Sequence, residues 1–398
     1  MRVLLVHSYY RSNSPSGEAH VFESELDLLQ RKGIEVETFT VHSDRMINQF
    51  GPTAPLVAGA LASWNPLVLR VFRHRVQAFR PDLVHVHNVF PWISPSVFYA
   101  LPKNTASVLT LHNYRIFCPN AIPARKGQIC TECLDNRSVM PALRHGCYRQ
   151  SRLATLPLAL NISFHRWLGT WNNKVDALIT LTDFQRKLLI KSGLPSAKVH
   201  VKPNFISGTP RVNPWAKRGD YALFVGRLSE EKGLTTLIDA WRIGGGQAPR
   251  LLIVGDGPLR NQLASSLLGL PIHLLGPRDH QETQQLIANA RLLLVPSEWF
   301  EGFALVIVEA FSLGTPVACS NLGPLPSIVK QGESGLNFEP HSPADLFAKV
   351  KSAWASPGLL EKLGQGARAA FDLHYNETAN FAHLMAIYHQ ALEVARRA

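Results

Sequence analysis

The strongest constraint on the fold of this chain is an alternation of short apolar segments with longer amphipathic ones, which runs through the sequence twice. The apolar segments have the β-branched content of buried strands. The segments between them place apolar residues at helical spacing, as in 18–29, where Phe22, Leu26 and Leu29 share one face. Near-continuous apolar strands separated by amphipathic helices predict parallel sheets that are covered on both faces.

The predicted strands fall into two sets, one in each half of the chain. The first set comprises 2–7, 35–41, 83–87, 106–111, 177–181 and 199–202, and the second comprises 221–225, 250–254, 272–275, 292–295 and 317–320. A polar, proline-rich linker at 203–219 separates them. Because 398 residues exceed the usual size of a single core, we predict two doubly wound α/β domains, 1–205 and 206–376. Ligands of such domains bind at the carboxyl ends of the strands.

Composition narrows the class of protein. Hydrophobic residues make up 46% of the chain and charged residues 18%, which excludes a disordered protein. No stretch approaches the roughly 20 apolar residues of a membrane span, and residues 1–7 lead into a strand without the apolar core of a secretory signal. We therefore predict a cytoplasmic protein. The net charge of +12 favours a polyanionic partner, namely nucleic acid, a phosphorylated small molecule or an anionic membrane. The basic residues are dispersed, which argues against nucleic acid.

Two carboxylates follow the strand 292–295. The loop after this strand carries Glu301 and Gly302, and an apolar helix at 305–313 contains Glu309 as its only charge. An ionised carboxylate in such a helix is costly unless it is paired or hydrogen-bonded. Glu309 therefore either pairs with a core lysine or arginine, or accepts hydrogen bonds from the vicinal hydroxyls of a sugar or ribose. The glycine before the helix N-terminus, which opens the backbone amides to a ligand, favours the second interpretation.

Two cations follow the strand 221–225. Arg227 and Lys232 lie in the loop between this strand and the next helix, where they suit a diphosphate through charge-assisted hydrogen bonds. The alternative is that both are solvated surface cations beside two neighbouring glutamates. A turn of small residues, Pro15-Ser16-Gly17, follows the first strand, and such turns let backbone amides approach a phosphate closely.

In their order and spacing these elements resemble glycosyltransferase family 4, the retaining family with the GT-B fold, in which two Rossmann-like domains face a cleft. The resemblance covers essentially the whole chain. It rests on the Glu-x7-Glu element 301–309, on Val225-Gly226-Arg227-Leu228 with Lys232-Gly233, and on the segments 254–258, 81–87, 110–112 and 314–317. It implies transfer of a hexose-type sugar from a nucleotide-diphosphate sugar to a hydroxyl of a glycan or lipid-linked acceptor, in cell-envelope or exopolysaccharide synthesis.

The resemblance assigns roles to individual residues. Arg227 and Lys232 would hold the donor diphosphate and neutralise its charge as it leaves. Glu301 would hydrogen-bond the transferred sugar, and Glu309 would bind the ribose hydroxyls. His112 would face the donor sugar from the first domain. The other donor-binding positions would be Gly17, Gly226, Arg278, Gly302, Phe303 and Ala304.

The resemblance also bears on cofactors and on the chain's end. Many members of the family carry Gly-Gly in the first turn, whereas this chain has Ser16-Gly17, which leaves open how closely that loop approaches the phosphate or acceptor. The sequence contains no Asp-x-Asp, the metal-nucleotide element of the other major glycosyltransferase fold. The two cations would stabilise the leaving group, and no cofactor would be required for catalysis. The C-terminal helix 377–398 would return to complete the first domain.

Four of the five cysteines gather in an insertion at 113–148. Cys130 and Cys133 have the spacing of metal ligands, with Cys118 and Cys147 on either side. In a cytosolic protein four such thiols suit a structural zinc ion better than disulfides. The alternative is four reduced thiols. The resemblance places the insertion over the acceptor side of the cleft.

Two further features have two interpretations each. His85 and His87 alternate on the strand 83–87, as metal ligands or, more commonly, as hydrogen-bonded fillers near a cleft. The helix at 64–79 carries arginines beside apolar residues. It is either a solvated helix of the domain or a peripheral contact with the anionic inner face of the plasma membrane.

Two other classes of function are retained as alternatives. One is a non-catalytic nucleotide-sugar-binding protein with the same cleft, against which the intact set of candidate catalytic residues argues. The other is a basic nucleic-acid-binding protein, against which the dispersed charge argues. A sugar phosphorylase shares the architecture, but its pyridoxal-binding lysine motif is not apparent. The donor sugar, its nucleobase and the acceptor are not identified by the sequence.

Overall fold

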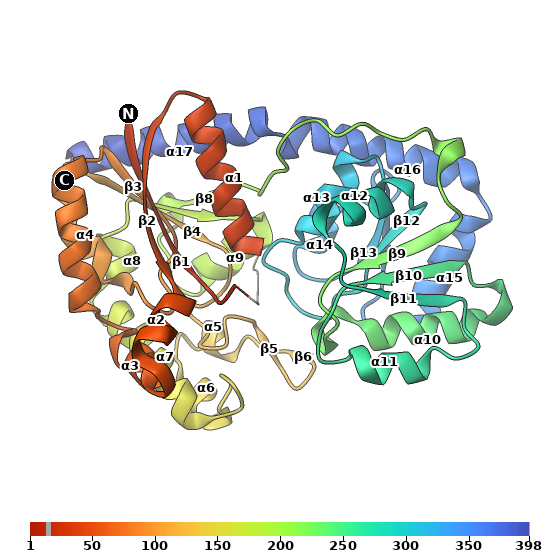
Figure 1. The fold of residues 1–398 in the computed structure, drawn as a ribbon, viewed down its shortest axis with the longest axis horizontal. Helices are drawn as coiled ribbons and strands as arrows, with labels where there is room; N and C mark the ends of the chain where they lie inside the picture. The colour runs from red at the N-terminus through yellow and green to blue at the C-terminus, as the bar shows by residue number, and fades with distance from the viewer. Residues whose placement is uncertain (13–16, 398) are drawn as a thin grey trace. The chain divides into compact units, whose positions relative to one another are not determined.

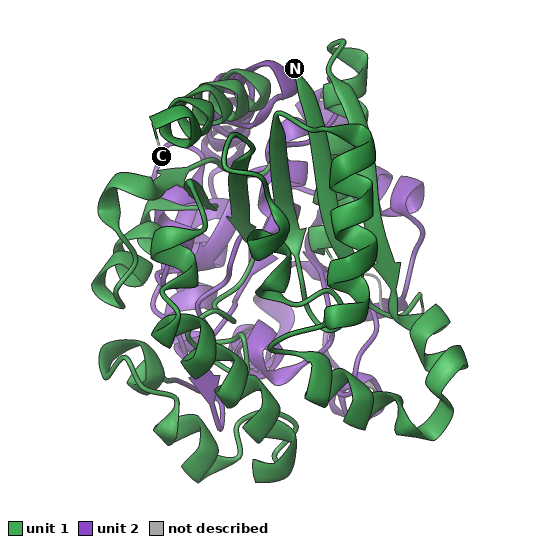
Figure 2. Cartoon of the chain, turned by 90° about the vertical axis from the view of Figure 1, so that its left-hand side faces the viewer, with its two compact units in different colours: residues 1–123, 130–204, 380–398 green, residues 124–129, 205–379 purple. Residues whose placement is uncertain are grey.

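The computed structural model describes residues 1–12 and 17–397, the side chains of 264 and 265 excepted. It divides into two compact units (Figure 2). Unit 1 comprises 1–123, 130–204 and 380–398, and unit 2 comprises 124–129 and 205–379. The predicted domains changed at 205/206 and again at 376/377, where the C-terminal helix returns to the first domain. The units change at 204/205 and 379/380, and unit 2 also takes the segment 124–129.

Unit 1 is built on a parallel six-stranded sheet with the order β2-β1-β3-β4-β7-β8 (Figure 1). The strands are β1 (Arg2–Tyr9), β2 (Glu35–His42), β3 (Leu83–Asn88), β4 (Ala106–Leu111), β7 (Ala177–Thr180) and β8 (Val199–Val201). β3 and β4 are buried along their whole length because both of their faces are covered. The strand order reverses between β1 and β3, which makes the carboxyl ends of these strands the expected ligand-binding edge.

Helices cover the sheet of unit 1. The main ones are α1 (Gly17–Arg31), α4 (Pro66–Phe79), α9 (Asp183–Lys191) and α17 (Glu377–Arg397). Leu384, Ile387 and Tyr388 of α17 join a core cluster that includes Val3. The apolar face of the C-terminal helix is thus buried against the core of unit 1.

Unit 1 contains further helices. They are α2 (Ser43–Phe50), α3 (Ala54–Leu61), α5 (Glu132–Asp135), α6 (Met140–His145), α7 (Arg152–Trp167) and α8 (Thr170–Asn173). The hairpin of β5 (Ala124–Arg125) and β6 (Gln128–Ile129) groups with unit 2. Among the described residues no single helix has both the length and the apolar content to cross a membrane. Two helical segments, 43–61 and 66–79, are long and apolar enough when taken together, but the pair is bent by 72°. The match rests on length and composition alone.

Unit 2 is a second parallel six-stranded sheet, with the order β11-β10-β9-β12-β13-β14. The strands are β9 (Tyr221–Val225), β10 (Arg250–Val254), β11 (Ile272–Gly276), β12 (Leu292–Val295), β13 (Val317–Ser320) and β14 (Gly335–Phe338). Its helices are α10 (Leu234–Gly244), α11 (Arg260–Ser266), α12 (His280–Asn289), α13 (Leu305–Ser312), α14 (Leu325–Ile328), α15 (Pro343–Trp354) and α16 (Pro357–Ala370). Buried clusters lie on both faces of the sheet. The strand order reverses between β9 and β12, so the loops after these strands flank the expected ligand site.

Every strand predicted from the alternating pattern is present, within two residues at each end. The pattern missed β14, which is short and contains a glycine and an asparagine, and it missed the hairpin β5–β6. The predicted helix 64–79 begins at Pro66, because Asn65 caps it by accepting a hydrogen bond from the Val68 amide. These differences move element ends but leave both sheets as predicted.

Candidate functional site

A buried ion pair lies at the point where the strand order of unit 2 reverses. Nζ of Lys232, after β9, lies 2.7 Å from Oε1 of Glu301, after β12. The same carboxylate oxygen accepts a hydrogen bond of 2.6 Å from Oγ of Ser297. Glu301 is 4% exposed, whereas the Lys232 side chain is 25% exposed. The carboxylate therefore holds the ammonium in place while leaving part of it open to a ligand.

A glycine brings these two loops together. Gly233 has φ +70°, and a Cβ built on it would lie 1.8 Å from the carbonyl oxygen of Pro296. Only a residue without a side chain allows this approach. The amide of Glu298 donates to the carbonyl of Glu231 at 2.9 Å, which closes the contact between the loops. The position of Lys232 against Glu301 is thus set by backbone packing.

The loop that carries Arg227 is fixed against the loop after β10. The amide of Gly226 donates to Val254 at 3.0 Å, and the amide of Leu228 donates to Asp256 at 2.9 Å. A Cβ on Gly257 would lie 2.4 Å from the Leu228 carbonyl oxygen, so the close approach requires glycine there. The side chain of Arg227 is exposed, and it forms no hydrogen bond or ion pair with the part of the chain that the structure describes. Its guanidinium is available to an anion.

Glu309 lies one turn inside α13 and is half-buried. Burial raises the pKa of this carboxyl, and the neighbouring His280 lowers it in part. Within the described ranges no lysine or arginine pairs with Glu309. The core ion pair, which was the alternative interpretation of this residue, is therefore not formed, and its carboxylate oxygens remain acceptors.

The N-terminus of α13 presents backbone amides. Ala304 is the N-cap and offers no side-chain hydrogen bond, and Gly302 and Phe303 precede it at intermediate exposure. The first amides of a helix need acceptors and carry the positive end of its dipole. Arg278, in contrast, follows the outermost strand β11, is exposed and lies 3.9 Å from Glu282 in a pair weakened by solvent.

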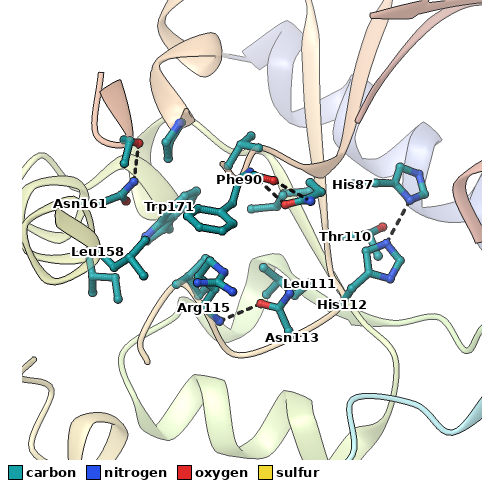
Figure 3. A pocket seen from close by; sticks show the side chains of 17 residues that line it. His87, Phe90, Thr110, Leu111, His112, Asn113, Arg115, Leu158, Asn161 and Trp171 are labelled. Atoms are coloured by element: carbon teal, nitrogen blue, oxygen red, sulfur yellow. Dashed lines mark hydrogen bonds between the residues drawn. The ribbon is translucent and has the colours of Figure 1, made fainter. Parts of the chain in front are cut away.

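Unit 1 places His112 directly after β4, at the carboxyl edge of its sheet. Nε2 of His112 lies 3.1 Å from Nδ1 of His87, whose Nε2 lies 3.2 Å from Oε1 of Glu25 (Figure 3 shows the histidine pair). The carboxylate can only accept, so His87 donates to it through Nε2. With the His87 ring carrying this one proton, its Nδ1 accepts. His112 then donates through Nε2, which leaves its Nδ1 as an acceptor. Burial lowers the pKa of His112 well below its usual range, so this neutral form persists.

Glu25 is the centre of a buried network that the sequence did not reveal. Its Oε2 lies 2.9 Å from Nζ of Lys202, and its Oε1 lies 3.0 Å from Nδ1 of His85. His85 also contacts the Tyr388 hydroxyl of α17 at 2.8 Å. Burial acts to raise the pKa of Glu25, but Lys202 and the two histidines hold it well below its usual range. One sequence feature could have pointed to this network, since Glu25 shares the apolar face of α1 with Phe22.

The ligand atoms of Glu25, His85 and His87 lie within 4.8 Å of one another, a spacing that also suits a metal ion. Two observations favour the hydrogen-bonded interpretation of these histidines. Lys202 already neutralises the carboxylate, and a cation would face its ammonium. His85 also uses its second nitrogen, which lies 2.7 Å from Oγ1 of Thr110.

The start of α1 carries the predicted position Gly17 and a buried carboxyl beside it. Gly17 is the first residue of α1, whereas Pro15 and Ser16 lie outside the described residues. Glu18, next to Gly17, was not singled out by the sequence. Burial raises the pKa of its carboxyl to about 7, although Arg115 and hydrogen bonds lower it in part. A side chain that titrates near neutrality at this edge is a candidate functional group.

None of the four clustered cysteines forms a disulfide in the structure. Cys118 and Cys133 are buried. Burial raises the pKa of Cys118 to about 12, with contributions from Cys133 and Cys147. Burial likewise raises the pKa of Cys133 to about 11, with contributions from Cys147 and Cys130. The four thiols thus lie near one another, although in the structure no three of them lie within the mutual 4.8 Å that marks a metal-ligand group.

A small cavity of about 70 Å³ lies beside His112 in unit 1 (Figure 3). His87, His112, Asn113 and Arg115 line its polar side. Arg115 stacks on Phe90 with its guanidinium carbon 4.1 Å from the ring centroid. Polar groups therefore converge at the carboxyl edge of each sheet: an ion pair with a free arginine in unit 2, and a tautomer-defined histidine in unit 1.

Each half of the chain matches the model of a known protein family. The family model described as Glycosyltransferase Family 4 matches residues 17–207, and the model described as Glycosyl transferases group 1 matches residues 208–370. A glycogen synthase of Mycobacterium tuberculosis is 28% identical over 73% of this chain and 64% of its own length. The putative teichuronic acid biosynthesis glycosyltransferase TuaC of Bacillus subtilis is 25% identical over 95% of this chain and 97% of its own length.

Solved structures show the same fold. The crystal structure of Anabaena HepE in complex with UDP aligns with a TM-score of 0.62 and 19% identity, covering 98% of this chain and 100% of that one. The architecture predicted from the sequence, GT-B with two Rossmann-like units, is confirmed. This chain spans less than two thirds of the length of several curated relatives. In one of them the matched part is only 21% of that relative's length.

Proposed function

The chain belongs to glycosyltransferase family 4, and we propose that it transfers a hexose-type sugar, with retention of configuration, from a nucleotide-diphosphate sugar to a glycan or lipid-linked acceptor. Two comparisons support this proposal. The Anabaena HepE structures contain UDP or UDP-glucose. TuaC is named for teichuronic acid biosynthesis, which fits a role in cell-envelope or exopolysaccharide synthesis. We further propose that the protein acts in the cytoplasm, at the inner face of the plasma membrane.

The observation that carries the proposal is the Lys232–Glu301 pair beside the unpaired Arg227. In the proposed reaction the two cations bind the donor diphosphate and stabilise the negative charge that builds on it as the glycosidic bond breaks. Charge stabilisation by preorganised groups is commonly the largest catalytic contribution. Both cations belong to the protein, so this step requires no metal ion.

The two carboxylates have separate proposed tasks. Glu309, which pairs with no lysine or arginine among the described residues, accepts hydrogen bonds from the ribose diol of the nucleotide. Glu301 orients Lys232 and, through its second oxygen, hydrogen-bonds the transferred sugar. The amides at the start of α13 bind the same ligand through Gly302, Phe303 and Ala304.

We assign the acceptor side of the reaction to unit 1. The unprotonated Nδ1 of His112 accepts a hydrogen bond from a sugar hydroxyl. The acceptor hydroxyl attacks from the side of the leaving group and gives its proton to the departing phosphate, which preserves the configuration at the anomeric carbon. The cations of unit 2 favour this step because they stabilise the charge that remains on the diphosphate.

Donor binding and turnover test this assignment. UDP-glucose and other nucleotide sugars should raise the melting temperature of the protein, and both Lys232→Ala and Glu309→Ala should abolish that rise. Lys351→Ala, which removes an exposed lysine of α15, is the matched control and should retain it. Retained folding is checked by circular dichroism. Unchanged donor hydrolysis in both site variants would overturn the site assignment.

We also propose that Cys118, Cys130, Cys133 and Cys147 hold a structural zinc ion. The proposal rests on the spacing of the four cysteines in the sequence and on their proximity in the fold, since thiolates held near one another can bind a divalent cation together. Emission spectroscopy of protein purified without added metal should find one zinc per chain. A chelator should remove it and lower the melting temperature. The proposal is contradicted if the purified protein contains no zinc and the chelator leaves its melting temperature unchanged.

A further inference from the structure

A large groove lies in unit 1 and has no part in the roles above. Its volume is about 970 Å³, at the upper end of the range for small-molecule sites. Helices α3 and α7 form two of its walls and lie side by side (Figure 1). They pack closely, since a Cβ on Gly59 would lie 3.1 Å from Cγ of Pro157. Most of the lining is aliphatic or aromatic, including Ala58, Ala154 and Trp92.

One end of the groove opens on an apolar surface. Leu56 of α3 and Leu153 of α7 both line the groove, yet they are 76% and 83% exposed. Leu156 and Leu160, which follow at helical spacing on α7, are exposed as well. Contiguous exposed leucines on neighbouring helices mark a surface that binds an apolar partner. The groove is therefore accessible to a long hydrocarbon chain from this side.

The groove also has a cationic part. Arg11, Arg115 and Arg149 line it, and no aspartate or glutamate is among the described residues of the lining. Arg115 is held over the ring of Phe90, and Arg149 lies over the ring of Tyr148 with its guanidinium carbon 5.4 Å from the centroid. Three arginines without a counter-charge in the lining suit a phosphate or diphosphate.

The cationic part of the groove adjoins the cavity at His112 through Arg115. The groove and that cavity share four lining residues, which are Ala62, Phe90, Arg115 and Leu158. A head group held by Arg115 would therefore lie next to His112, the residue of unit 1 that we place against the transferred sugar. Glu18 interacts with Arg115, but burial raises the pKa of its carboxyl to about 7, which weakens it as a counter-charge.

We propose that this groove binds the hydrocarbon chain of a lipid phosphate or lipid diphosphate, whose charged head group the three arginines hold beside His112. The proposal deepens the proposed transferase function, on which it rests, by placing the lipid as acceptor. A soluble glycan is a poorer occupant, because the groove offers aliphatic walls where a glycan needs hydrogen-bonding groups. The apolar rim would let the chain enter from a membrane.

Binding of a fluorescent derivative of hexadecyl phosphate tests the proposal without any sugar transfer. Ala58→Trp, which fills the groove, should weaken binding at least tenfold. Ala78→Trp, on an exposed part of α4 outside the groove, is its control and should bind as the unaltered protein does. Leu56→Glu places a charge at the rim without altering the interior and should also weaken binding. Its control is Leu268→Glu, at a leucine of unit 2 that is 87% exposed.

Competition identifies the occupant. Hexadecyl phosphate should displace the probe, whereas butyl phosphate and hexadecanol should each need at least tenfold higher concentrations. If butyl phosphate competes equally well, the site is a phosphate site and the proposal is wrong. Equal binding by Ala58→Trp and Ala78→Trp, or by both glutamate variants, would also overturn it. Nucleotide-sugar melting shifts measured on the same protein report on the donor site alone, so failure of either proposal is seen independently.

Discussion

Replacing Lys202 by methionine should destabilise unit 1 strongly. Lys202 is 1% exposed and its partner Glu25 is 0% exposed. At their separation of 2.9 Å, attraction between unit charges amounts to about 6 kcal/mol with an effective dielectric constant of about 20. Removing both ions from water costs several kcal/mol each, so this attraction mainly offsets burial. Lys202→Met removes the offset and leaves the carboxylate buried, at an expected cost of about 3–5 kcal/mol.

A double-mutant cycle measures the effect. Glu25→Gln should cost a similar amount, because it leaves the ammonium buried without its counter-charge. The double variant should be destabilised by much less than the sum of the two, since neither charge remains. Native-state hydrogen exchange of the β1 and β3 amides reports the unfolding free energy of unit 1 separately from unit 2.

A matched control sets the scale for this cycle. Lys187→Met breaks an exposed pair with Asp183, whose Nζ–Oδ2 distance is 2.6 Å and whose side chains are 75% and 51% exposed. It should cost less than about 1 kcal/mol. The reasoning is refuted if Lys202→Met costs no more than this control, or if the Glu25 and Lys202 effects simply add.

Two further predictions concern pH and loop packing. Burial lowers the pKa of His7 to about 3 and that of His85 to about 4, so the unfolded chain binds more protons below pH 6.5 and the melting temperature should fall between pH 6.5 and 4. Glu18, whose pKa is raised to about 7, opposes this trend, because its contribution to stability is present below pH 4.5 and is lost as the pH rises through 7. A melting temperature that rises on acidification would contradict the histidine assignment. Gly233→Ala should abolish the melting shift caused by nucleotide sugars, because its Cβ would collide with the Pro296 carbonyl, whereas Gly246→Ala, with nothing within 4 Å, should preserve it. Equal shifts in both variants would show that loop packing does not position Lys232.

The sequence by itself determined the architecture and the donor loops. Apolar strands and amphipathic helices differ in period, so their alternation is visible along the chain and fixes two parallel α/β units. The candidate donor residues were equally visible, because each lies in a short loop directly after a strand. In parallel sheets the carboxyl ends of neighbouring strands share an edge, which brings Lys232 and Glu301 together although 69 positions separate them.

Only the tertiary structure decided the remainder. Glu25 and Lys202 are 177 positions apart, and their pairing, like the pKa of Glu25, depends on what surrounds them after folding. The groove between α3 and α7 is likewise invisible in the sequence. Its lining comes from several segments of unit 1, each of ordinary composition, and its apolar interior and three arginines become one surface only when the helices pack.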